Sequence, residues 1–397
     1  MSARSSKSVQ PLPPGSTIGL LGGGQLGRMF AKAAARLGFH VHVFAPDEES
    51  PAAEVSLLHT RASYNDLDAV ARFAQSVDAI TYEFENVLGP TVETADRFAP
   101  VRPHSCVLSV TRNRLAEKGF LSRNGIPVAP YSPAASAEEL EQARQQLGGR
   151  VVVKTTAFGY DGKGQSMCHA AADSIAAWGR IGAPGEAIVE QFIPFEGECS
   201  MLVARGMSGK TVFFGPFFNE HRNHILDVTT WSADDSSAVA REAREISAAV
   251  ADALALDGMI CIEFFITGKG LLVNEIAPRP HNSGHLTLEA CSISQFEQQV
   301  RMAAGYDPVE PVPRAPAAAM INLLGDLWTD GEPDWSAVLA RPEISFHLYG
   351  KSEPKPDRKM GHLTVLAETP DAAAAAVKDA RRALRRSPEA ALNEEVA

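Results

Sequence analysis

Two glutamates in the second half of the chain stand in a pattern that can bind a divalent cation. Glu263 and Glu275 lie in the largely apolar segments IEFFIT and LLVNEIA, which flank the turn residues GKG. If residues 268–270 form a three-residue hairpin loop, the two glutamates face each other across antiparallel strands. Opposed carboxylates repel each other, and Mg²⁺ relieves this by bridging carboxylates to nucleotide phosphates. A register that differs by one residue would place them on opposite faces, one exposed and the other ion-paired.

A loop rich in polar side chains follows directly after the second of these glutamates. Its sequence is APRPHNSGH, in which proline and glycine interrupt regular structure. The polar members are Arg279, His281, Asn282, Ser283 and His285. Charged and polar groups gathered in a loop beside a metal are typical of a site that binds and orients a substrate. We therefore expect this loop to contact a substrate.

A glycine-rich stretch earlier in the chain predicts a phosphate-binding hairpin. In VVVKTTAFGYDGKGQ, residues 151–165, glycine follows Lys163, and strand patterns lie on both sides. A P-loop would need serine or threonine after the lysine and then a helix, so this segment is not one. Its amides and Lys163 can fold over phosphates, and Lys154 would be costly to bury without an anion. The alternative is an ordinary hairpin with solvated lysines.

The segment IGLLGGGQLGRMF, residues 18–30, matches the G-x-G-x-x-G pattern of dinucleotide-binding turns. Gly22, Gly24 and Gly27 follow an apolar run and precede a helical pattern. In such turns the glycines permit a tight turn, the approach of a phosphate and close packing of helix on strand. The pattern alone is weak. It leaves NAD(P), another phosphorylated ligand and a purely structural role open.

Two further glutamates lie where a parallel sheet binds ligands. Glu83 and Glu85, in TYEFENV, end the third predicted strand of the N-terminal region. Because ligands collect at the carboxyl ends of parallel strands, we expect both glutamates to converge with the turn around Gln25. There they would face the hydroxyls or the amine of a ligand. The alternative is that they are surface carboxylates in a strand-end loop.

Two weaker clusters complete the polar motifs. The stretch VEQFIPFEGE offers Glu190, whose strand-end neighbours can present backbone groups to a purine edge, and Glu198, which can accept hydrogen bonds from ribose hydroxyls. In YGKSEPKPDRKMGH, the basic side chains of Lys351, Arg358 and Lys359 lie around a turn. A solvated basic loop and a phosphate-binding patch both fit this run.

The elements that must position these residues fall into three groups. Residues 16–100 alternate strands and helices in the βαβαβ order of a parallel, doubly wound sheet. From residue 112 the pattern is α+β: we expect 187–194 to pair with 198–206, and 259–277 to form a hairpin, with a long helix at 232–256 between the two pairs. The predicted division is a disordered tail (1–15), a Rossmann-like domain (16–111), an α+β domain (112–305), a small β-rich domain (306–385) and a flexible tail (386–397).

Composition argues against several classes of partner. The chain has 37 basic and 48 acidic side chains and a formal net charge of −11, which disfavours nucleic acid and anionic lipid. No apolar run approaches the roughly 20 residues that span a bilayer, and the first 15 residues lack the apolar core of a secretory signal. The five cysteines are scattered without C-x-x-C spacing, which favours a reducing compartment. We expect a cytoplasmic protein that binds neither nucleic acid nor membrane.

Together these motifs resemble the ATP-grasp superfamily. Within it the chain is most similar to the 5-(carboxyamino)imidazole ribonucleotide synthases, the biotin-independent carboxylases of purine synthesis. The resemblance covers about residues 16–365 and rests on GGGQLGRM, TYEFENV, FGYDGKGQ, NEIAPRPHNSGH, SQFEQQVR and GKSEPKPDRKMGH. It implies an α/β and α+β architecture with a pre-ATP-grasp domain, a central ATP-grasp domain and a small C-terminal β-rich domain, assembled as a homodimer.

The resemblance also implies which residues bind each ligand. For ATP they are Arg114, Lys154, Gly159, Tyr160, Asp161, Gly162, Lys163, Gly164, Gln165, Glu190, Gln191, Phe192, Ile193, Glu198, His221, Asn274 and Glu275. For Mg²⁺ they are Glu263 and Glu275. For aminoimidazole ribonucleotide they are Gln25, Leu26, Glu83, Tyr160, Asp161, Arg279, His281 and Asn282, with Lys351, Arg358 and Lys359 at the 5′-phosphate.

The implied reaction is a carboxylation that consumes ATP and bicarbonate. Bicarbonate attacks the γ-phosphate to give carboxyphosphate, and the exocyclic amine of the ribonucleotide is carboxylated by it or by CO₂ released from it. Lys163 would neutralise developing charge, while Arg279 and His281 would orient the bicarbonate-derived anion and handle a proton. The glycine turn would then hold the ribonucleotide and not NAD.

Two alternatives remain at this point. A formate-dependent glycinamide ribonucleotide transformylase shares the architecture and the PRPH loop. It tends, however, to carry an acidic residue at the position of Gln25 and a serine-rich stretch in place of FGYDGKG. The second alternative is that residues 1–110 form a dinucleotide-binding regulatory module on an unrelated ligase. Titration with NADH and with ATP would separate these, because an ATP-grasp site needs Mg²⁺ for tight nucleotide binding.

Overall fold

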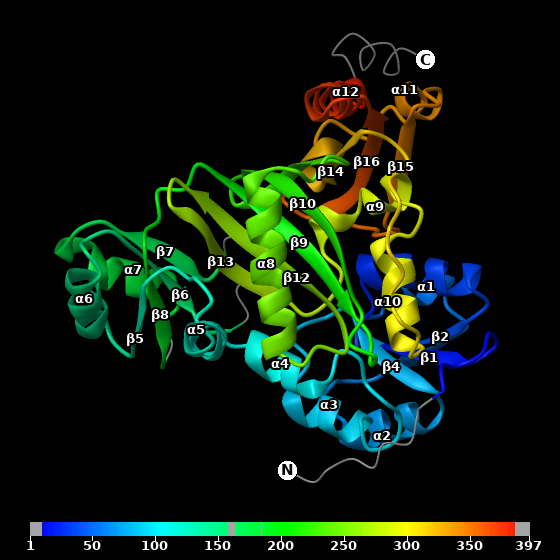
Figure 1. The fold of residues 1–397 in the computed structure, drawn as a ribbon, viewed down its shortest axis with the longest axis horizontal. Helices are drawn as coiled ribbons and strands as arrows, with labels where there is room; N and C mark the ends of the chain where they lie inside the picture. Colours follow the sequence, from blue (N-terminus) through cyan, green and yellow to red (C-terminus); the bar gives the residue numbers. More distant parts are fainter. Residues whose placement is uncertain (1–9, 158–162, 184, 386–397) are drawn as a thin grey trace.

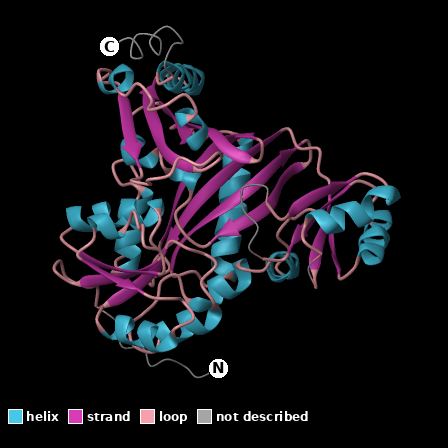
Figure 2. Ribbon diagram, turned by 180° about the vertical axis from the view of Figure 1, so that it is seen from behind, coloured by secondary structure: helices cyan, strands magenta, loops and turns pink. Residues whose placement is uncertain are grey.

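The computed structural model describes residues 10–157, 163–183 and 185–385. These residues form three β-sheets with helices packed around them. In Figure 1 the N-terminal sheet lies at the lower right, and a small sheet with helices α6 (Ala137–Gln146) and α7 (Ser174–Arg180) lies at the left. A long central sheet runs between them and continues into the C-terminal lobe at the top. The same three lobes are visible from behind in Figure 2.

The N-terminal region forms a parallel sheet of the predicted doubly wound kind. Its elements are β1 (Thr17–Leu21), α1 (Gln25–Arg36), β2 (His40–Ala45), β3 (Leu58–Arg61), α2 (Leu67–Gln75), β4 (Ala79–Tyr82), α3 (Gly89–Ala95) and α4 (Ser105–Thr111). The strand order is β3–β2–β1–β4, with one apolar cluster under α1 and another under α2. The sequence analysis missed β3, because LHTR is short and mostly exposed and carries no apolar pattern.

A small antiparallel sheet forms the left lobe of Figure 1. Its elements are β5 (Tyr131–Ala134), β6 (Val151–Thr155), β7 (Gln165–Cys168) and β8 (Ala187–Gln191). Strands β6 and β7 form the predicted hairpin, with Lys154 opposite Gln165. The predicted pairing of 187–194 with 198–206 is wrong, because β8 pairs with β5 and β6. Residues 192–196, between β8 and β9, include Pro194, which interrupts the strand pattern, so the two apolar runs enter different sheets.

The central sheet is antiparallel and extends into the C-terminal region. Its elements are β9 (Gly197–Arg205), β10 (Thr211–Arg222), β11 (Ile225–Ser232), α8 (Ala238–Ala253), β12 (Gly258–Thr267), β13 (Gly270–Ala277), β14 (Ala317–Leu324), β15 (Ile344–Leu348) and β16 (Lys359–Ala367). The order is β13–β12–β9–β10–β11–β14–β16–β15. The strands predicted for a small C-terminal domain therefore continue the central sheet. Helix α8 packs on an apolar cluster that β9, β12 and β13 share.

The hairpin loop between β12 and β13 is shorter than predicted. Thr267 pairs with Gly270, so the loop contains two residues. The predicted three-residue loop at 268–270 is wrong. Since side chains alternate between faces along a strand, this difference of one residue should by itself have moved the second glutamate to the wrong face.

A β-bulge restores the predicted opposition of the two glutamates. Phe264 pairs with Val273, and this register would set Glu263 opposite Asn274. The register shifts between Glu263 and Phe264, so that Asn274 is the extra residue and Glu263 pairs with Glu275. The opposition is therefore confirmed, but it depends on a bulge that the sequence analysis did not anticipate.

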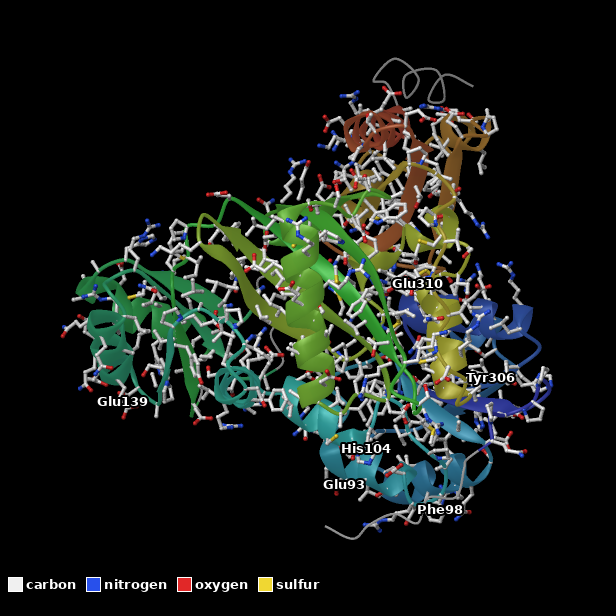
Figure 3. The ribbon with its side chains drawn as sticks, viewed as in Figure 1. Glu93, Phe98, His104, Glu139, Tyr306 and Glu310 are labelled. Carbon is white, nitrogen blue, oxygen red and sulfur yellow. The ribbon has the colours of Figure 1, made fainter. Side chains whose placement is uncertain are left out.

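Helix α10 (Gln295–Ala303) joins the N-terminal lobe to the central region. Its residues Phe296 and Val300 lie in the same apolar cluster as residues of α1 and β2. Beyond the end of the helix, Tyr306, labelled in Figure 3, donates a hydrogen bond to the Leu12 carbonyl at 2.9 Å. These contacts hold the N-terminal sheet against the centre of the molecule.

Two further helices of at least ten residues pack against the sheets. They are α5 (Arg114–Arg123), which follows the N-terminal sheet, and α12 (Pro370–Ala383), which packs on β14 and β16. Helices α9 (Thr287–Ala290) and α11 (Ser336–Leu339) are single turns. Among the described residues, none of the helices has the length and apolar character needed to cross a bilayer.

The close packing of α1 on the N-terminal sheet predicts a stability difference between two glycines. A Cβ at Gly27 would lie 2.8 Å from Leu20 Cδ2 and 2.9 Å from the Ala52 Cβ, whereas a Cβ at Gly179 in α7 would meet nothing within 4 Å. Gly27→Ala should therefore lower the free energy of unfolding by about 1–3 kcal/mol through overpacking. Gly179→Ala should raise it by up to about 1 kcal/mol through helix propensity. Urea unfolding of both variants measures this, and equal stabilities would contradict the packing described.

Candidate active site

Glu263 and Glu275 form a carboxylate pair at the centre of the candidate site. Arg114 Nη2, at the start of α5, lies 3.8 Å from Glu275 Oε2. Burial raises the pKa of Glu275, and repulsion by Glu263 raises it further, while Arg114 lowers it. Among the described residues, no group of three or more His, Cys, Asp or Glu side chains is placed to hold a metal ion. Two carboxylates nevertheless fit Mg²⁺, which usually takes one or two of them and completes its shell with phosphate and water oxygens.

His281 connects this pair to the polar loop. Its Nε2 lies 3.0 Å from Glu263 Oε1, and its Nδ1 lies 2.9 Å from Ser283 Oγ. Gln295 fixes the His281 backbone by accepting from its N–H at 2.9 Å and donating to its carbonyl at 2.8 Å. Burial lowers the pKa of His281, but Cys261 and Glu263 raise it by more. Burial likewise raises the pKa of Glu263, yet the His281 ring lowers it overall.

A buried chain of polar side chains supports His281 from the central sheet. Ser283 Oγ lies 2.7 Å from Ser200 Oγ, which accepts from Asn219 Nδ2 at 3.1 Å. Thr229 Oγ1 in turn donates to Asn219 Oδ1 at 3.0 Å. The sequence analysis missed Ser200, Asn219 and Thr229, because they lie on strands far from His281 in the chain. The available signal was a polar residue at an inward position of an apolar strand.

Two lysines and a glutamate form a buried ionic cluster beside α5. Lys154 Nζ lies 2.6 Å from Glu190 Oε2, and Lys118 Nζ lies 3.6 Å from Glu190 Oε1. Burial raises the pKa of Glu190, but Lys118 and Lys154 lower it to about 2. The anion that Lys154 requires on burial is therefore provided by this chain. Lys118 is only 1% exposed, and the sequence analysis missed it because nothing in its helix marked that position.

The segment at the end of β8 is predicted to present backbone groups to a purine edge. Gln191 Nε2 donates to the Leu147 carbonyl at 3.0 Å, and the Arg150 guanidinium lies 4.2 Å from the centre of the Phe192 ring. The side chains of Gln191 and Phe192 are therefore engaged within the small lobe. If this segment, which includes Ile193, contacts a purine, its main chain would make most of the contact.

Glu198 and His221 form a pair across β9 and β10. His221 Nδ1 lies 2.7 Å from Glu198 Oε2, and both side chains are partly exposed. The two residues predicted for the nucleotide are thus brought together. Their exposed edges leave oxygen and nitrogen atoms for a polar ligand.

The glycine turn is occupied by a carboxylate of this chain. The Gly24 amide donates to Glu83 Oε1 at 2.6 Å, and the Gly27 amide donates to Glu83 Oε2 at 3.4 Å. Gly22 has a φ of +121°, and a Cβ there would lie 2.6 Å from Glu83 Cγ. The predicted convergence of Glu83 with the turn is confirmed. Because a dinucleotide pyrophosphate uses the amides of such a turn, Glu83 takes the position that NAD would need.

The first residues of α1 continue from this turn. Gln25 begins the helix and is partly exposed, whereas the Leu26 side chain is 7% exposed and lies in an apolar cluster. The Leu26 side chain is therefore turned inward. If Leu26 contacts a substrate, its main chain provides most of that contact.

The polar loop after β13 is anchored to the N-terminal lobe. Arg279 Nη2 lies 2.8 Å from Glu85 Oε2, and Arg279 Nη1 donates to the Pro280 carbonyl. Asn282 is 9% exposed, and within the described structure neither polar atom of its amide has a hydrogen-bond partner. A buried amide in that state is suited to a polar ligand. His285, by contrast, is fully buried and belongs to the interior.

The basic loop between β15 and β16 approaches the site from the C-terminal lobe. Lys351 Nζ donates to the Lys359 carbonyl at 2.6 Å. Burial raises the pKa of Glu83, and Lys351 is among the groups that lower it, as Lys359 is for Glu263. Arg358 Nη1 donates to a main-chain carbonyl of its own loop. The structure thus brings the two lysines toward the glutamates.

Part of the predicted phosphate loop lies outside the described residues. The positions concerned are Gly159, Tyr160, Asp161 and Gly162. Beyond them, the Gly164 carbonyl accepts from the Thr155 amide at 2.8 Å, and Gln165 begins β7. Lys163 precedes this hairpin base. Asn274, also predicted for the nucleotide, is the extra residue of the bulge.

Known families match three successive parts of the chain. They are a ribonucleotide synthetase preATP-grasp domain at residues 16–112, an ATP-grasp domain at 119–296 and a phosphoribosylaminoimidazole carboxylase C-terminal domain at 318–376. The N5-carboxyaminoimidazole ribonucleotide synthase of Brucella melitensis is 42% identical over 89% of this chain and 97% of its own length. The chain belongs to the N5-carboxyaminoimidazole ribonucleotide synthase family. It is an ATP-grasp, ATP-dependent ligase.

Further members of the family extend the match. The Bacillus subtilis synthase is 38% identical over 92% of this chain and 95% of its own length. A bifunctional purine synthesis protein of Dictyostelium discoideum is 39% identical, and this chain spans 38% of its length. A solved N5-carboxyaminoimidazole ribonucleotide synthetase in complex with ADP has a TM-score of 0.87, with 37% identity over 94% of this chain and 98% of that one.

The Glu198–His221 pair predicts a pH dependence of stability. Burial lowers the pKa of His221, but Glu198 raises it above its ordinary value of 6.5. The stability that the pair adds is therefore fully present below pH 6.5 and is lost as the pH rises through the folded-state pKa. We expect the wild type to exceed His221→Gln in free energy of unfolding by more at about pH 6 than at about pH 9. Urea unfolding at both pH values measures this, and a constant difference would contradict the pairing.

Proposed function

We propose that this chain uses ATP and bicarbonate to carboxylate 5-aminoimidazole ribonucleotide, giving N5-carboxyaminoimidazole ribonucleotide. The names of its relatives support this, as does an Aspergillus clavatus synthase solved with ADP and 5-aminoimidazole ribonucleotide, with 26% identity and a TM-score of 0.83 over 94% of this chain and 100% of that one. Within the chain, the observation that carries the proposal is the opposition of Glu263 and Glu275 beside Arg114.

ATP would lie between the small lobe and the central sheet. Arg114, Lys154 and Lys163 provide positive charge for its phosphates, and the Glu198–His221 pair provides partners for its ribose. The segment 190–193 would offer main-chain groups to the adenine. Gln165 begins β7, and Asn274 is the extra residue of the bulge in β13. Mg²⁺ at the two glutamates would neutralise triphosphate charge and polarise the γ-phosphate.

Arg279 and His281 are suited to the bicarbonate-derived anion. Arg279 carries a fixed positive charge, and its contact with Glu85 holds the guanidinium near the carboxyl end of β4. His281 is held at both ring nitrogens and at its backbone, so its orientation is set before a substrate binds. A preorganised imidazole of this kind can accept or return one proton during the attack of the substrate amine on the activated carboxyl group.

The ribonucleotide would lie between the glycine turn and the C-terminal lobe. Glu83 shapes the turn and so directs Gln25 and the Leu26 main chain toward the substrate. The unpartnered Asn282 amide supplies a buried polar contact. Tyr160 and Asp161, which lie outside the described residues, are the further candidates for substrate binding. Lys351, Lys359 and Arg358 suit the 5′-phosphate, because they are basic residues of the adjoining loop.

The remaining predictions belong to the same proposal. We propose a cytoplasmic homodimer, with domains at residues 16–111, 112–305 and 306–385, and tails at 1–15 and 386–397. The family relationship supports the assembly and the location. The formate-dependent transformylase gains no support from the relatives, and the dinucleotide module loses its anion site to Glu83.

The metal assignment predicts a loss of activity in one variant. Glu275→Gln removes one charge of the pair, and we expect bicarbonate-dependent ADP release to fall more than about 100-fold, because the cation loses a ligand. The matched control is Glu245→Gln, the same change at an exposed position of α8, which should leave turnover unchanged. Both variants should keep the wild-type free energy of unfolding, measured in urea, to within about 1 kcal/mol. Full turnover in Glu275→Gln would remove the assignment.

The substrate assignment predicts selectivity between two ribonucleotides. ADP release with bicarbonate should rise when 5-aminoimidazole ribonucleotide is added, and the product should contain one carboxyl group from labelled bicarbonate. Formate with glycinamide ribonucleotide should give no stimulation. Stimulation by formate and glycinamide ribonucleotide alone would overturn the proposal in favour of the transformylase.

A further inference from the structure

We propose that Lys118 and Glu117 of α5 are positioning residues for the metal pair, because they hold the β-bulge that turns Glu275 toward Glu263. The inference rests on the proposed function, since it takes the two glutamates as the ligands of Mg²⁺. It adds two residues that touch neither the nucleotide nor the ion. Their effect passes through the main chain of β13.

The bulge is required for the two carboxylates to meet. Along β13, Leu271 and Val273 lie in the apolar cluster under α8, and so does Ile276. Regular alternation from Val273 would turn Glu275 into that cluster and leave Ile276 on the other face. With Asn274 as an extra residue, Glu275 lies opposite Glu263 and Ile276 takes the buried position. The bulge thus places the apolar side chain of Ile276, and not the charged side chain of Glu275, in the cluster.

Helix α5 contacts the main chain on both sides of the bulge. Lys118 Nζ donates to the Val273 carbonyl at 3.0 Å and to the Asn274 carbonyl at 2.7 Å. Glu117 Oε2 accepts from the Ile276 amide at 3.0 Å. Strand β13 lies at the edge of the central sheet, so main-chain groups that point away from β12 have no neighbouring strand there, and a buried unpaired group is costly. These bonds supply the missing partners at residues 273, 274 and 276.

The chemistry of the two side chains suits this task. Lys118 is 1% exposed and Glu117 is 2% exposed, so water does not compete for their hydrogen bonds to the main chain. Lysine has three donors on a tetrahedral nitrogen, which can serve two carbonyls and a carboxylate at once. The third partner of Lys118 is Glu190, 3.6 Å away, which also pairs with Lys154. The metal pair and the buried ionic cluster are therefore connected through one ammonium group.

The test compares Lys118→Met with Lys154→Met. Both changes remove a lysine from Glu190, but only the first removes donors from the bulge. We expect Lys118→Met to raise the concentration of Mg²⁺ needed for half-maximal ADP release by about 10- to 100-fold, the range typical when the support of a metal ligand is lost. Saturating Mg²⁺ should recover most of kcat. Lys154→Met should instead raise the KM for ATP and leave the Mg²⁺ requirement within about threefold of wild type.

A binding measurement without turnover supplies the second readout. Mn²⁺ titrated into the ADP complex and followed by electron paramagnetic resonance should bind about 10-fold more weakly to Lys118→Met than to wild type. Hydrogen exchange of residues 273–277 should be faster in that variant before any metal is added. An unchanged Mn²⁺ affinity with a raised KM for ATP would overturn the proposal, because Lys118 would then act only through Glu190.

The Glu117 variants keep the inference testable if Lys118→Met does not fold. Glu117→Gln retains an acceptor oxygen for the Ile276 amide and should bind Mn²⁺ within about threefold of wild type, whereas Glu117→Met should lose about 10-fold. Equal affinities in the two variants would overturn the role of Glu117. Failure of the proposed function would look different, since Glu275→Gln would then keep its turnover while the Lys118 and Glu117 variants still loosened the bulge.

Discussion

The site depends on two like charges being held on one face of a sheet. Side chains alternate along a strand, so the face of a residue changes with every residue inserted or removed. In this chain a two-residue hairpin loop and a one-residue bulge together bring Glu263 opposite Glu275. Either feature alone would place one carboxylate among the apolar residues under α8. The repulsion that remains between the two groups is the reason that a cation is favoured there.

Polar contacts around the two glutamates join the three lobes to the site. Glu190 and the two lysines lie between the small lobe and α5, and Arg279 with Glu85 joins the substrate loop to the N-terminal sheet. Lys351 and Lys359 of the C-terminal lobe act on the same centre, because they lower the pKa values of Glu83 and Glu263. Each of these charged side chains has a partner within the chain, which offsets the cost of desolvation. The lobes are therefore arranged around one charged centre before a ligand binds.

Much of the architecture and most of the site could be predicted from sequence. The alternating elements of residues 16–100, the β6–β7 hairpin and the opposed glutamates each leave a local pattern. The features that were missed have long-range causes. The bulge at Asn274 is held by Lys118, 156 residues away, and Ser283 lies against Ser200, 83 residues away. The strand β3 and the break between β8 and β9 were missed for a different reason. The sequence of β3 has no apolar pattern, and the apolar runs of β8 and β9 are close enough in the chain to resemble a hairpin.

The most direct test of this account is a crystal structure of the chain with ADP and Mg²⁺. We predict one Mg²⁺ ion with an oxygen of Glu263 and an oxygen of Glu275 both at about 2.0–2.1 Å, and the remaining positions filled by phosphate and water oxygens. An ion held by the phosphates and only one of these glutamates, with the other carboxylate turned into the apolar cluster under α8, would contradict it.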